Sequence, residues 1–159
     1  MIHDVSVIEN IISNNERKKL IVDCQDYLRD LGEDYPGLQT HANLHEHYEF
    51  FDVIVKITER VSKILKKDLK PGRSWINCDG GYVDHLCWHN HKGFDYSMVY
   101  YMKTQPILRN SGTLFSKKFV RAPQNGAIIF PSFLDHTAPT YKFFPWIMRY
   151  TLAIDFKCV

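Results

Sequence analysis

Long apolar segments are absent from this chain of 159 residues. No stretch approaches the ~20 apolar residues that a helix needs to cross a bilayer, so we expect no transmembrane segment. The N-terminal stretch MIHDVSVIENIIS carries Asp4 and Glu9, and it lacks the basic start and the long apolar core of a secretory signal. These absences predict a soluble, cytoplasmic protein.

An excess of charge of one sign is also absent. The formal net charge is only +2, which by itself favours neither a nucleic acid nor a membrane surface as a partner. Low-complexity segments are missing as well, and the chain is 45% hydrophobic and 24% charged, which is the composition of a globular protein. A chain of this length is expected to form one domain, residues 1–159, that buries a sizeable core.

Cysteines are few and scattered. Cys24, Cys78, Cys87 and Cys158 show no CxxC spacing. This disfavours both a zinc knuckle and a disulfide framework, and we expect reduced thiols that are mostly buried.

Helical periodicity is confined to the first part of the chain, residues 1–70. Ser13 and Glu16 have the spacing of a capping box, and apolar residues then recur at helical intervals until Gly32. A second helix is expected from about residue 47 to residue 67, and the Pro-Gly pair at 71–72 marks its boundary with the next segment. This part is predicted to be mostly helical and to support the rest.

Strand-like runs fill the second part, residues 71–159. They are short, aromatic and β-branched: SWINC, GYVDHLCWH, YSMVYYM, GTLFS, AIIF and RYTLAIDF. No alternation of strand, helix and parallel strand recurs, which disfavours a Rossmann-like sheet. Helices followed by antiparallel strands favour a mainly β protein, a β-roll of two sheets with two packed supporting helices.

Histidines stand at strand-like spacing within CWHNHKGFDYSMVYY. His89 and His91 are two residues apart, so in a strand they lie on one face, either converging on a metal or forming an ordinary polar surface pair. His136 follows an apolar run in FPSFLDHTAP, and alternation places Arg149 and Thr151 on one face of RYTLAIDF. Burying an imidazole without a partner costs about 1–3 kcal/mol, so such a cluster usually binds something.

The order of these motifs resembles a known family. SWIN, HNH, SMVYYM, GTLF, NGAIIFPSFLDHTAP and RYTLAIDF occur between Ser74 and Phe156 in the order seen in iron(II)- and 2-oxoglutarate-dependent oxygenases, especially a prolyl-4-hydroxylase-like group of small oxygenases. The resemblance implies a double-stranded β-helix, a jelly-roll or cupin-like core. It also implies a dioxygenase of hydroxylase type that couples oxidative decarboxylation of 2-oxoglutarate to succinate with hydroxylation of a substrate.

The resemblance further implies the metal ligands, which are the only catalytic residues expected. His89 would be the first ligand of Fe(2+) and His136 the last. The middle ligand of the family is usually a carboxylate, whereas this chain has His91 at that position. Three neutral imidazoles leave the metal with its full +2 charge, and Asp95 is the alternative source of a carboxylate.

Co-substrate and substrate residues follow from the same resemblance. Arg149 would bind the distal carboxylate of 2-oxoglutarate through its planar guanidinium, with help from Thr151 and Tyr101. Dioxygen is the other small-molecule partner, and the substrate would be a peptide, with prolyl the favoured residue, or an amino acid. The candidate residues at the substrate mouth are Trp146, Asn77 and Tyr82.

Two other interpretations remain open. His85 with His89 and His91 forms HxxxHxH, which would suit a cupin-like metalloenzyme that does not use 2-oxoglutarate. A non-catalytic β-roll binding module is the second, with the histidines as polar packing. The pair Arg149 and Thr151 favours the oxygenase, because a cupin has no use for a carboxylate anchor after its last ligand.

Overall fold

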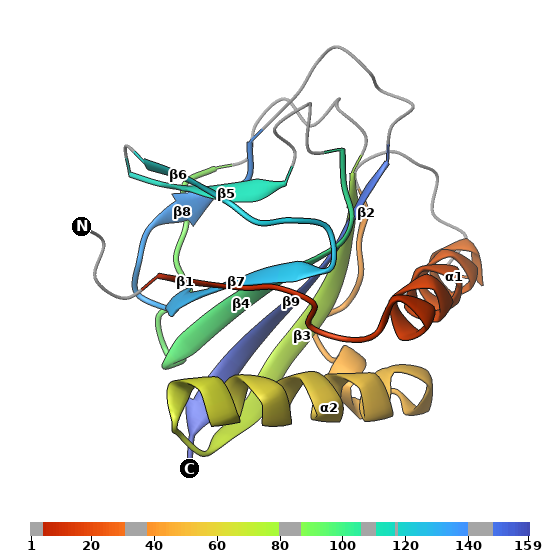
Figure 1. The fold of residues 1–159 in the computed structure, drawn as a ribbon, viewed down its shortest axis with the longest axis horizontal. Helices are drawn as coiled ribbons and strands as arrows, with labels where there is room; N and C mark the ends of the chain where they lie inside the picture. Colours follow the sequence, from red (N-terminus) through yellow and green to blue (C-terminus); the bar gives the residue numbers. More distant parts are fainter. Residues whose placement is uncertain (1–4, 31–37, 80–86, 106–110, 117, 140–147) are drawn as a thin grey trace.

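Two antiparallel sheets and two α-helices are the main elements of the described part of the chain (Figure 1). The computed structural model describes residues 5–30, 38–79, 87–105, 111–116, 118–139 and 148–159. Its elements are β1 (Ser6–Ile8), α1 (Asn14–Asp30), β2 (Leu38–Gln39), the 3-10 helix η1 (Leu44–Glu46), α2 (Tyr48–Leu65), β3 (Leu69–Asp79), β4 (Tyr96–Lys103), β5 (Gly112–Phe115), β6 (Lys118–Arg121), β7 (Gly126–Pro131), β8 (His136–Thr137) and β9 (Arg149–Cys158). Within the described ranges, no helix is both long and apolar enough to cross a membrane.

The strands form a roll of two sheets. The larger sheet has six strands in the order β1-β7-β4-β9-β3-β2, and the smaller has three in the order β6-β5-β8. The paired neighbours in both sheets are antiparallel. The helices lie on one side of the larger sheet and the smaller sheet lies on the other (Figure 1). The expected double-stranded β-helix is therefore confirmed.

Both helices form where the sequence pattern predicts them. The amide of Ser13 donates to the Glu16 carboxylate (2.9 Å) and the amide of Glu16 donates to the Ser13 hydroxyl (3.3 Å), so the capping box is present. The predicted stop of this helix at Gly32 lies outside the described residues. Helix α2 is capped by His47 and Lys66, within one residue of its expected limits.

The main core lies between the helices and the larger sheet. Apolar side chains on one face of each helix pack against the outward face of the sheet. The helices contribute Leu20, Cys24, Leu28, Phe50, Ile54, Ile57 and Val61, and the sheet contributes Ile76, Tyr100, Leu152 and Ile154 among others. A second, smaller cluster lies on the inward side: Tyr101, Phe115, Ala122, Ile128 and Phe130. Because both faces of the central strands are covered, β9 is buried from Arg149 to Phe156.

The prediction of strand limits was wrong at two places. The Pro-Gly pair at 71–72 does not end a segment but lies within β3, where the pairing register with β9 shifts between Pro71 and Arg73. The short β2 pairs with β3 only at Asn77 and Cys78, so β3 is an edge strand at Pro71. An edge strand and a bulge both tolerate a residue without an amide donor. Residues 87–88 are not in a strand, and residues 81–86 of the same predicted run lie outside the described residues.

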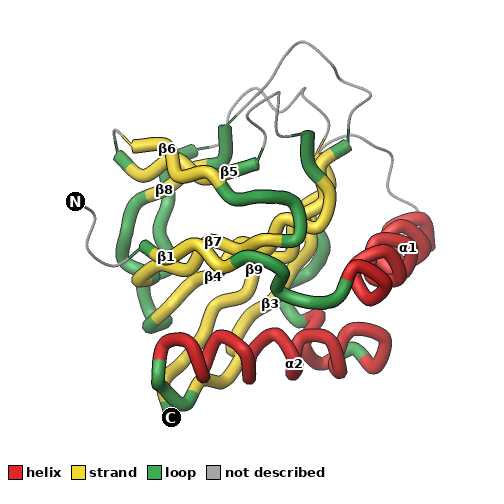
Figure 2. Tube along the Cα trace, viewed as in Figure 1, coloured by secondary structure: helices red, strands yellow, loops and turns green. Residues whose placement is uncertain are grey.

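The shortest strands were not predicted, because two or three residues are too few to show an alternation of apolar and polar side chains. In particular, β1 and β2 come from the part expected to be helical, yet both join the larger sheet. Figure 2 shows β1 lying along β7 before the chain turns into α1. The first 70 residues thus contribute strands as well as helices.

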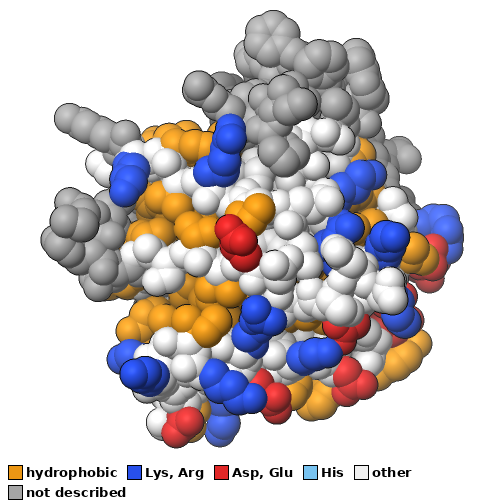
Figure 3. Space-filling view, viewed as in Figure 1, with side chains coloured by type: hydrophobic (Ala, Val, Ile, Leu, Met, Phe, Trp, Pro, Cys, Tyr) orange, Lys and Arg blue, Asp and Glu red, His pale blue; other side chains and the backbone are white. Residues whose placement is uncertain are grey.

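The surface has no single-sign charge over the face shown in Figure 3. Lys and Arg side chains there are interspersed with Asp and Glu, and apolar atoms lie between them. This distribution agrees with the small net charge of the chain.

Candidate metal centre and adjoining cavity

The inward face of the larger sheet is built in rows across three strands, β4, β9 and β3. Pairing places Tyr101, Thr151 and Asn77 in one row. The next row holds Val99, Ala153 and Trp75, and the third holds Ser97, Asp155 and Arg73. The first and third rows, which are mostly polar, therefore lie on either side of the second row, which is mostly apolar. Because neighbours within a row lie on one face, each polar row presents its groups together.

The first two rows, with Ser97 and Arg73 of the third, line a cavity of about 600 Å³ between the two sheets. Its wall includes every member of the first two rows, together with Arg149 at the start of β9. The histidines His89, His91 and His136 also belong to the lining. The cavity thus combines a cluster of imidazoles with a buried guanidinium.

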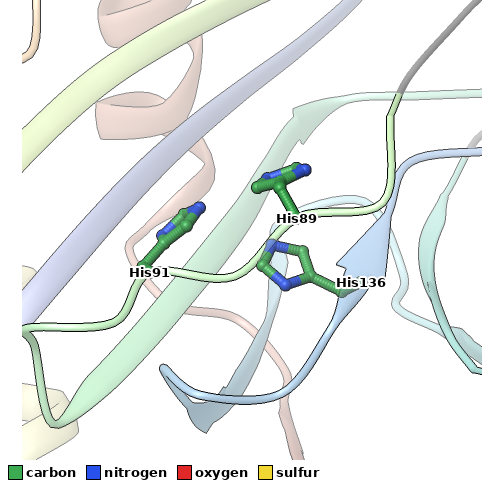
Figure 4. Close-up of side chains that lie close together, drawn as sticks. All are labelled: His89, His91 and His136. Atoms are coloured by element: carbon green, nitrogen blue, oxygen red, sulfur yellow. The ribbon is translucent and has the colours of Figure 1, made fainter.

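The three histidines meet although they come from different segments. His89 and His91 lie on the extended segment before β4, and His136 begins β8 (Figure 4). The backbones of His89 and His136 form a bridge, with N–H to O distances of 3.1 and 2.9 Å. One ligand atom from each ring lies within 4.8 Å of those of the other two. The predicted convergence of these residues is therefore present.

Hydrogen bonds select the same ring nitrogen for the metal in all three histidines. Nδ1 of His89 lies 2.9 Å from the carbonyl oxygen of Cys87, and Nδ1 of His136 lies 2.9 Å from that of Leu134. Carbonyl oxygens only accept, so each Nδ1 carries the proton and each Nε2 offers its lone pair. Nδ1 of His91 lies 2.5 Å from Oδ1 of Asp155 in the same manner. Such outer hydrogen bonds are typical of histidines that bind a metal.

Burial favours the neutral form of one of these imidazoles. Removal from water, supported by its neighbours His89 and His91, lowers the pKa of His136 from 6.5 to about 4, although its bond to the Leu134 carbonyl opposes the shift. Only 4% of this residue is exposed, whereas His89 is exposed. The His136 lone pair is consequently available at neutral pH, and the cluster faces solvent on its His89 side.

Asp155 is a site residue that the sequence reasoning missed. It lies on the inward face of β9, two residues after Ala153, and is fully buried. Burial alone would raise its pKa, but hydrogen bonds from His91, Ser97 and Arg73 outweigh burial and hold the pKa below its ordinary value. The signal was present in RYTLAIDF, because the alternation that places Arg149 and Thr151 inward also places Asp155 inward.

Asp95 lies apart from the histidine cluster. Its side chain is exposed, and its Oδ2 accepts a hydrogen bond of 2.9 Å from the amide of Cys158. Among the residues that the structure describes, the group able to hold a metal contains His91 and not Asp95. The geometry therefore favours His91 over Asp95 for the position of the middle ligand.

The residues expected around the co-substrate face the same cavity. Arg149 and Thr151 are only 4% and 3% exposed, and both line it. Tyr101 lines it too, with its hydroxyl 2.6 Å from that of Thr113, whereas Tyr100 points into the main core and donates to Asn125. The predicted alternation of β4 and β9 is thus correct.

Of the candidates for the substrate mouth, only Asn77 lies in the described part of the chain. Its amide is 3.4 Å from the Thr151 hydroxyl, which places it beside Thr151 in the cavity wall. Tyr82 and Trp146 lie outside the described residues, as does His85 of the cupin-like pattern.

The histidine cluster fits a divalent transition metal such as iron(II). Imidazole nitrogen is a ligand suited to iron, zinc and copper, and each ring has its second nitrogen engaged by an outer acceptor. Three protein ligands leave coordination positions open for small molecules. His89, His91 and His136 would hold the metal, and the adjoining cavity would receive what binds beside it.

Comparisons with known proteins agree with the fold. The chain matches no protein-family model and no curated protein. Among solved structures it is similar to the viral collagen prolyl hydroxylase vCPH from Paramecium Bursaria Chlorella virus-1 in its 2OG complex, with 15% identity, a TM-score of 0.64, and coverage of 98% of this chain and 96% of that one.

Two further structures resemble it over most of the chain. HygX from Streptomyces hygroscopicus, with nickel and 2-oxoglutarate bound, has 9% identity and a TM-score of 0.71, covering 97% of this chain and 82% of that one. The non-heme alpha ketoglutarate dependent carbocyclase SnoK from nogalamycin biosynthesis has 10% identity and a TM-score of 0.79, covering 96% and 79%. At these identities the likeness shows a shared fold.

Proposed function

We propose that this protein is an iron(II)- and 2-oxoglutarate-dependent oxygenase of hydroxylase type. The observation that carries the proposal is one cavity lined by three convergent histidines and by the buried Arg149. The similar structures vCPH and HygX are described with 2-oxoglutarate bound, and HygX is also described with iron, in the same fold. These likenesses support the proposal.

The metal and 2-oxoglutarate would supply the oxidising chemistry. Dioxygen would provide one oxygen atom to succinate, formed with loss of carbon dioxide, and the other to a hydroxyl group on the substrate. The chain itself binds and orients. His89, His91 and His136 hold the metal through Nε2, and the open side near the exposed His89 admits the substrate.

Arg149 would anchor the distal carboxylate of 2-oxoglutarate. A guanidinium offers a planar fork of donors that matches a carboxylate, and the burial of Arg149 strengthens the interaction by excluding water. The Asn77 amide donates to the Thr151 oxygen at 3.4 Å, so the Thr151 hydroxyl proton can point to the same carboxylate. Tyr101 would add a phenol from the neighbouring strand. We therefore assign Asn77 to the co-substrate pocket and not to the substrate mouth.

The central row, Val99, Ala153 and Trp75, leaves space for the co-substrate over the middle of β9. Ala153 lies between the row of Thr151 and the row of Asp155, so β9 carries only a methyl group at this point. A flat dicarboxylate can lie across it, with one end at Arg149 and the 2-oxo acid end at the histidines. This arrangement favours 2-oxoglutarate over a cupin-like reaction, which needs no carboxylate anchor in the cavity wall.

We expect the iron-loaded protein to convert 2-oxoglutarate to succinate, and to form succinate faster when a compound that it hydroxylates is present. Incubation in air with iron(II), 2-oxoglutarate and a panel of proline-containing peptides and free amino acids tests this. Succinate is quantified, and mass spectrometry detects the gain of one oxygen atom. His136→Ala is the matched control, because it removes a metal ligand at the same cavity. Succinate formation equal in both proteins, or absent across the panel, would contradict the proposal.

A further inference from the structure

One of the three histidines differs from the other two in its outer partner. His89 and His136 donate to neutral backbone carbonyls, whereas His91 donates to the carboxylate of Asp155. His91 is also the residue that stands where the similar family has a carboxylate ligand. The three histidines carry no negative charge, and the carboxylate of Asp155 supplies one by contacting the ligand His91.

The position of Asp155 is fixed from both sides. Its cross-strand neighbours are Ser97 on β4 and Arg73 on β3. Oδ1 accepts from the Ser97 hydroxyl at 2.6 Å and from His91 at 2.5 Å. Oδ2 accepts from Nη2 and Nε of Arg73 at 2.6 and 3.0 Å. Since the Ser97 hydroxyl, the His91 ring and the Arg73 guanidinium all donate hydrogen bonds to the carboxylate, they hold it in its charged form and in one orientation.

We propose that Asp155 is a positioning residue for the metal. It holds His91 with the proton on Nδ1 and the Nε2 lone pair toward the metal, and it supplies through this imidazole the negative charge that a carboxylate ligand would supply directly. The proposal rests on the proposed metal site.

The chemistry of such a pair explains why His91 is a workable replacement. A histidine whose N–H is bonded to a carboxylate is a more basic ligand than one bonded to a carbonyl, and its ring cannot rotate or change tautomer freely. Arg73 belongs to the same unit. It binds the oxygen that His91 does not use, so it stabilises the charge of Asp155 without competing for the imidazole.

Asp155→Asn tests the proposal with the metal alone. The amide keeps the shape of the side chain but loses the charge, and its NH₂ group must face a donor, either His91 or Arg73. We expect the dissociation constant for cobalt(II), followed by its visible absorption in the absence of 2-oxoglutarate, to rise by about 10- to 100-fold, as for other outer partners of metal ligands. The shape of the cobalt spectrum should also change, because one ligand is no longer fixed.

Ser97→Ala is the matched control within the same buried network. It removes the hydrogen bond to Asp155, the 2.8 Å contact with the Ser132 hydroxyl and a longer contact of 3.2 Å with Nδ1 of His91. Because the carboxylate and its 2.5 Å bond to His91 remain, the dissociation constant for cobalt should rise less than in Asp155→Asn. Equal affinity in Asp155→Asn and wild type would overturn the proposal and leave Asp155 as a structural residue. Failure of the wild type itself to bind cobalt would instead overturn the proposed metal site.

A second measurement does not depend on the Asp155→Asn variant. Nitrogen-15 NMR of the histidine rings in the metal-free wild-type protein at pH 8 reports which nitrogen carries the proton. We expect Nδ1–H for His91, assigned by its loss in His91→Gln. The Nε2–H form would overturn the proposal even if Asp155→Asn did not fold.

Discussion

We expect His91→Ala to lose metal binding while its fold is kept. The substitution removes one of the three histidines proposed to hold the metal, so the dissociation constant for iron(II) should rise by more than the roughly 10–100-fold that loss of an outer partner costs. The fold should persist because Asp155 retains its contacts with Ser97 and Arg73 after the imidazole has gone. Anaerobic titration with iron(II), alongside thermal unfolding of the metal-free proteins, measures both effects.

Asp95→Ala is the control for this substitution. The carboxylate of Asp95 is exposed and binds the amide of Cys158, so its removal should leave iron affinity unchanged. If the two results were exchanged, with Asp95→Ala losing the metal and His91→Ala keeping it, the site would be of the two-histidine, one-carboxylate type. The assignment of His91 as a ligand would then be wrong.

Arg149→Met should abolish tight binding of 2-oxoglutarate and spare the metal. Truncating one partner of a buried, hydrogen-bonded charge pair costs about 2–5 kcal/mol. At ~1.4 kcal/mol per decade, the dissociation constant for 2-oxoglutarate should rise by at least about thirtyfold. Methionine preserves much of the length of the side chain, and iron affinity measured without 2-oxoglutarate should not change.

Calorimetric titration of 2-oxoglutarate into the iron-loaded proteins under anaerobic conditions gives these constants. Arg29→Met is the matched control, because Arg29 lies on α1 with 71% of its side chain exposed and pairs only with acidic neighbours on the same helix in the described structure. It should bind 2-oxoglutarate as the wild type does. Wild-type affinity in Arg149→Met would show that the guanidinium has another role and would remove the main support for the choice of co-substrate.

The sequence was sufficient for features that depend on local periodicity. Alternation along RYTLAIDF separates Arg149, Thr151 and Ala153 from Tyr150, Leu152 and Ile154, and the structure places the first set in the cavity wall and the second in the main core. Helical spacing and the capping box similarly predicted α1. Such patterns persist because one face of each element is buried.

Features that depend on pairing between distant segments were not predictable from one sequence. The link between His91 and Asp155 requires the register of β4 and β9, which aligns Ser97 with Asp155. The pairing of β1 with β7 likewise joins residues more than 100 positions apart. Pro71 was misread for the same reason, since a proline within a strand is tolerated only where no neighbouring strand requires its amide.

The central claim is that three histidines hold a metal with positions left open for 2-oxoglutarate. Anaerobic addition of iron(II) and then 2-oxoglutarate to the metal-free protein, followed by visible absorption, tests it most directly. We expect a charge-transfer band that saturates at equimolar iron and 2-oxoglutarate, because a 2-oxo acid chelated to iron(II) absorbs visible light. Stoichiometric metal binding without any such band would mean a closed site and would contradict the account.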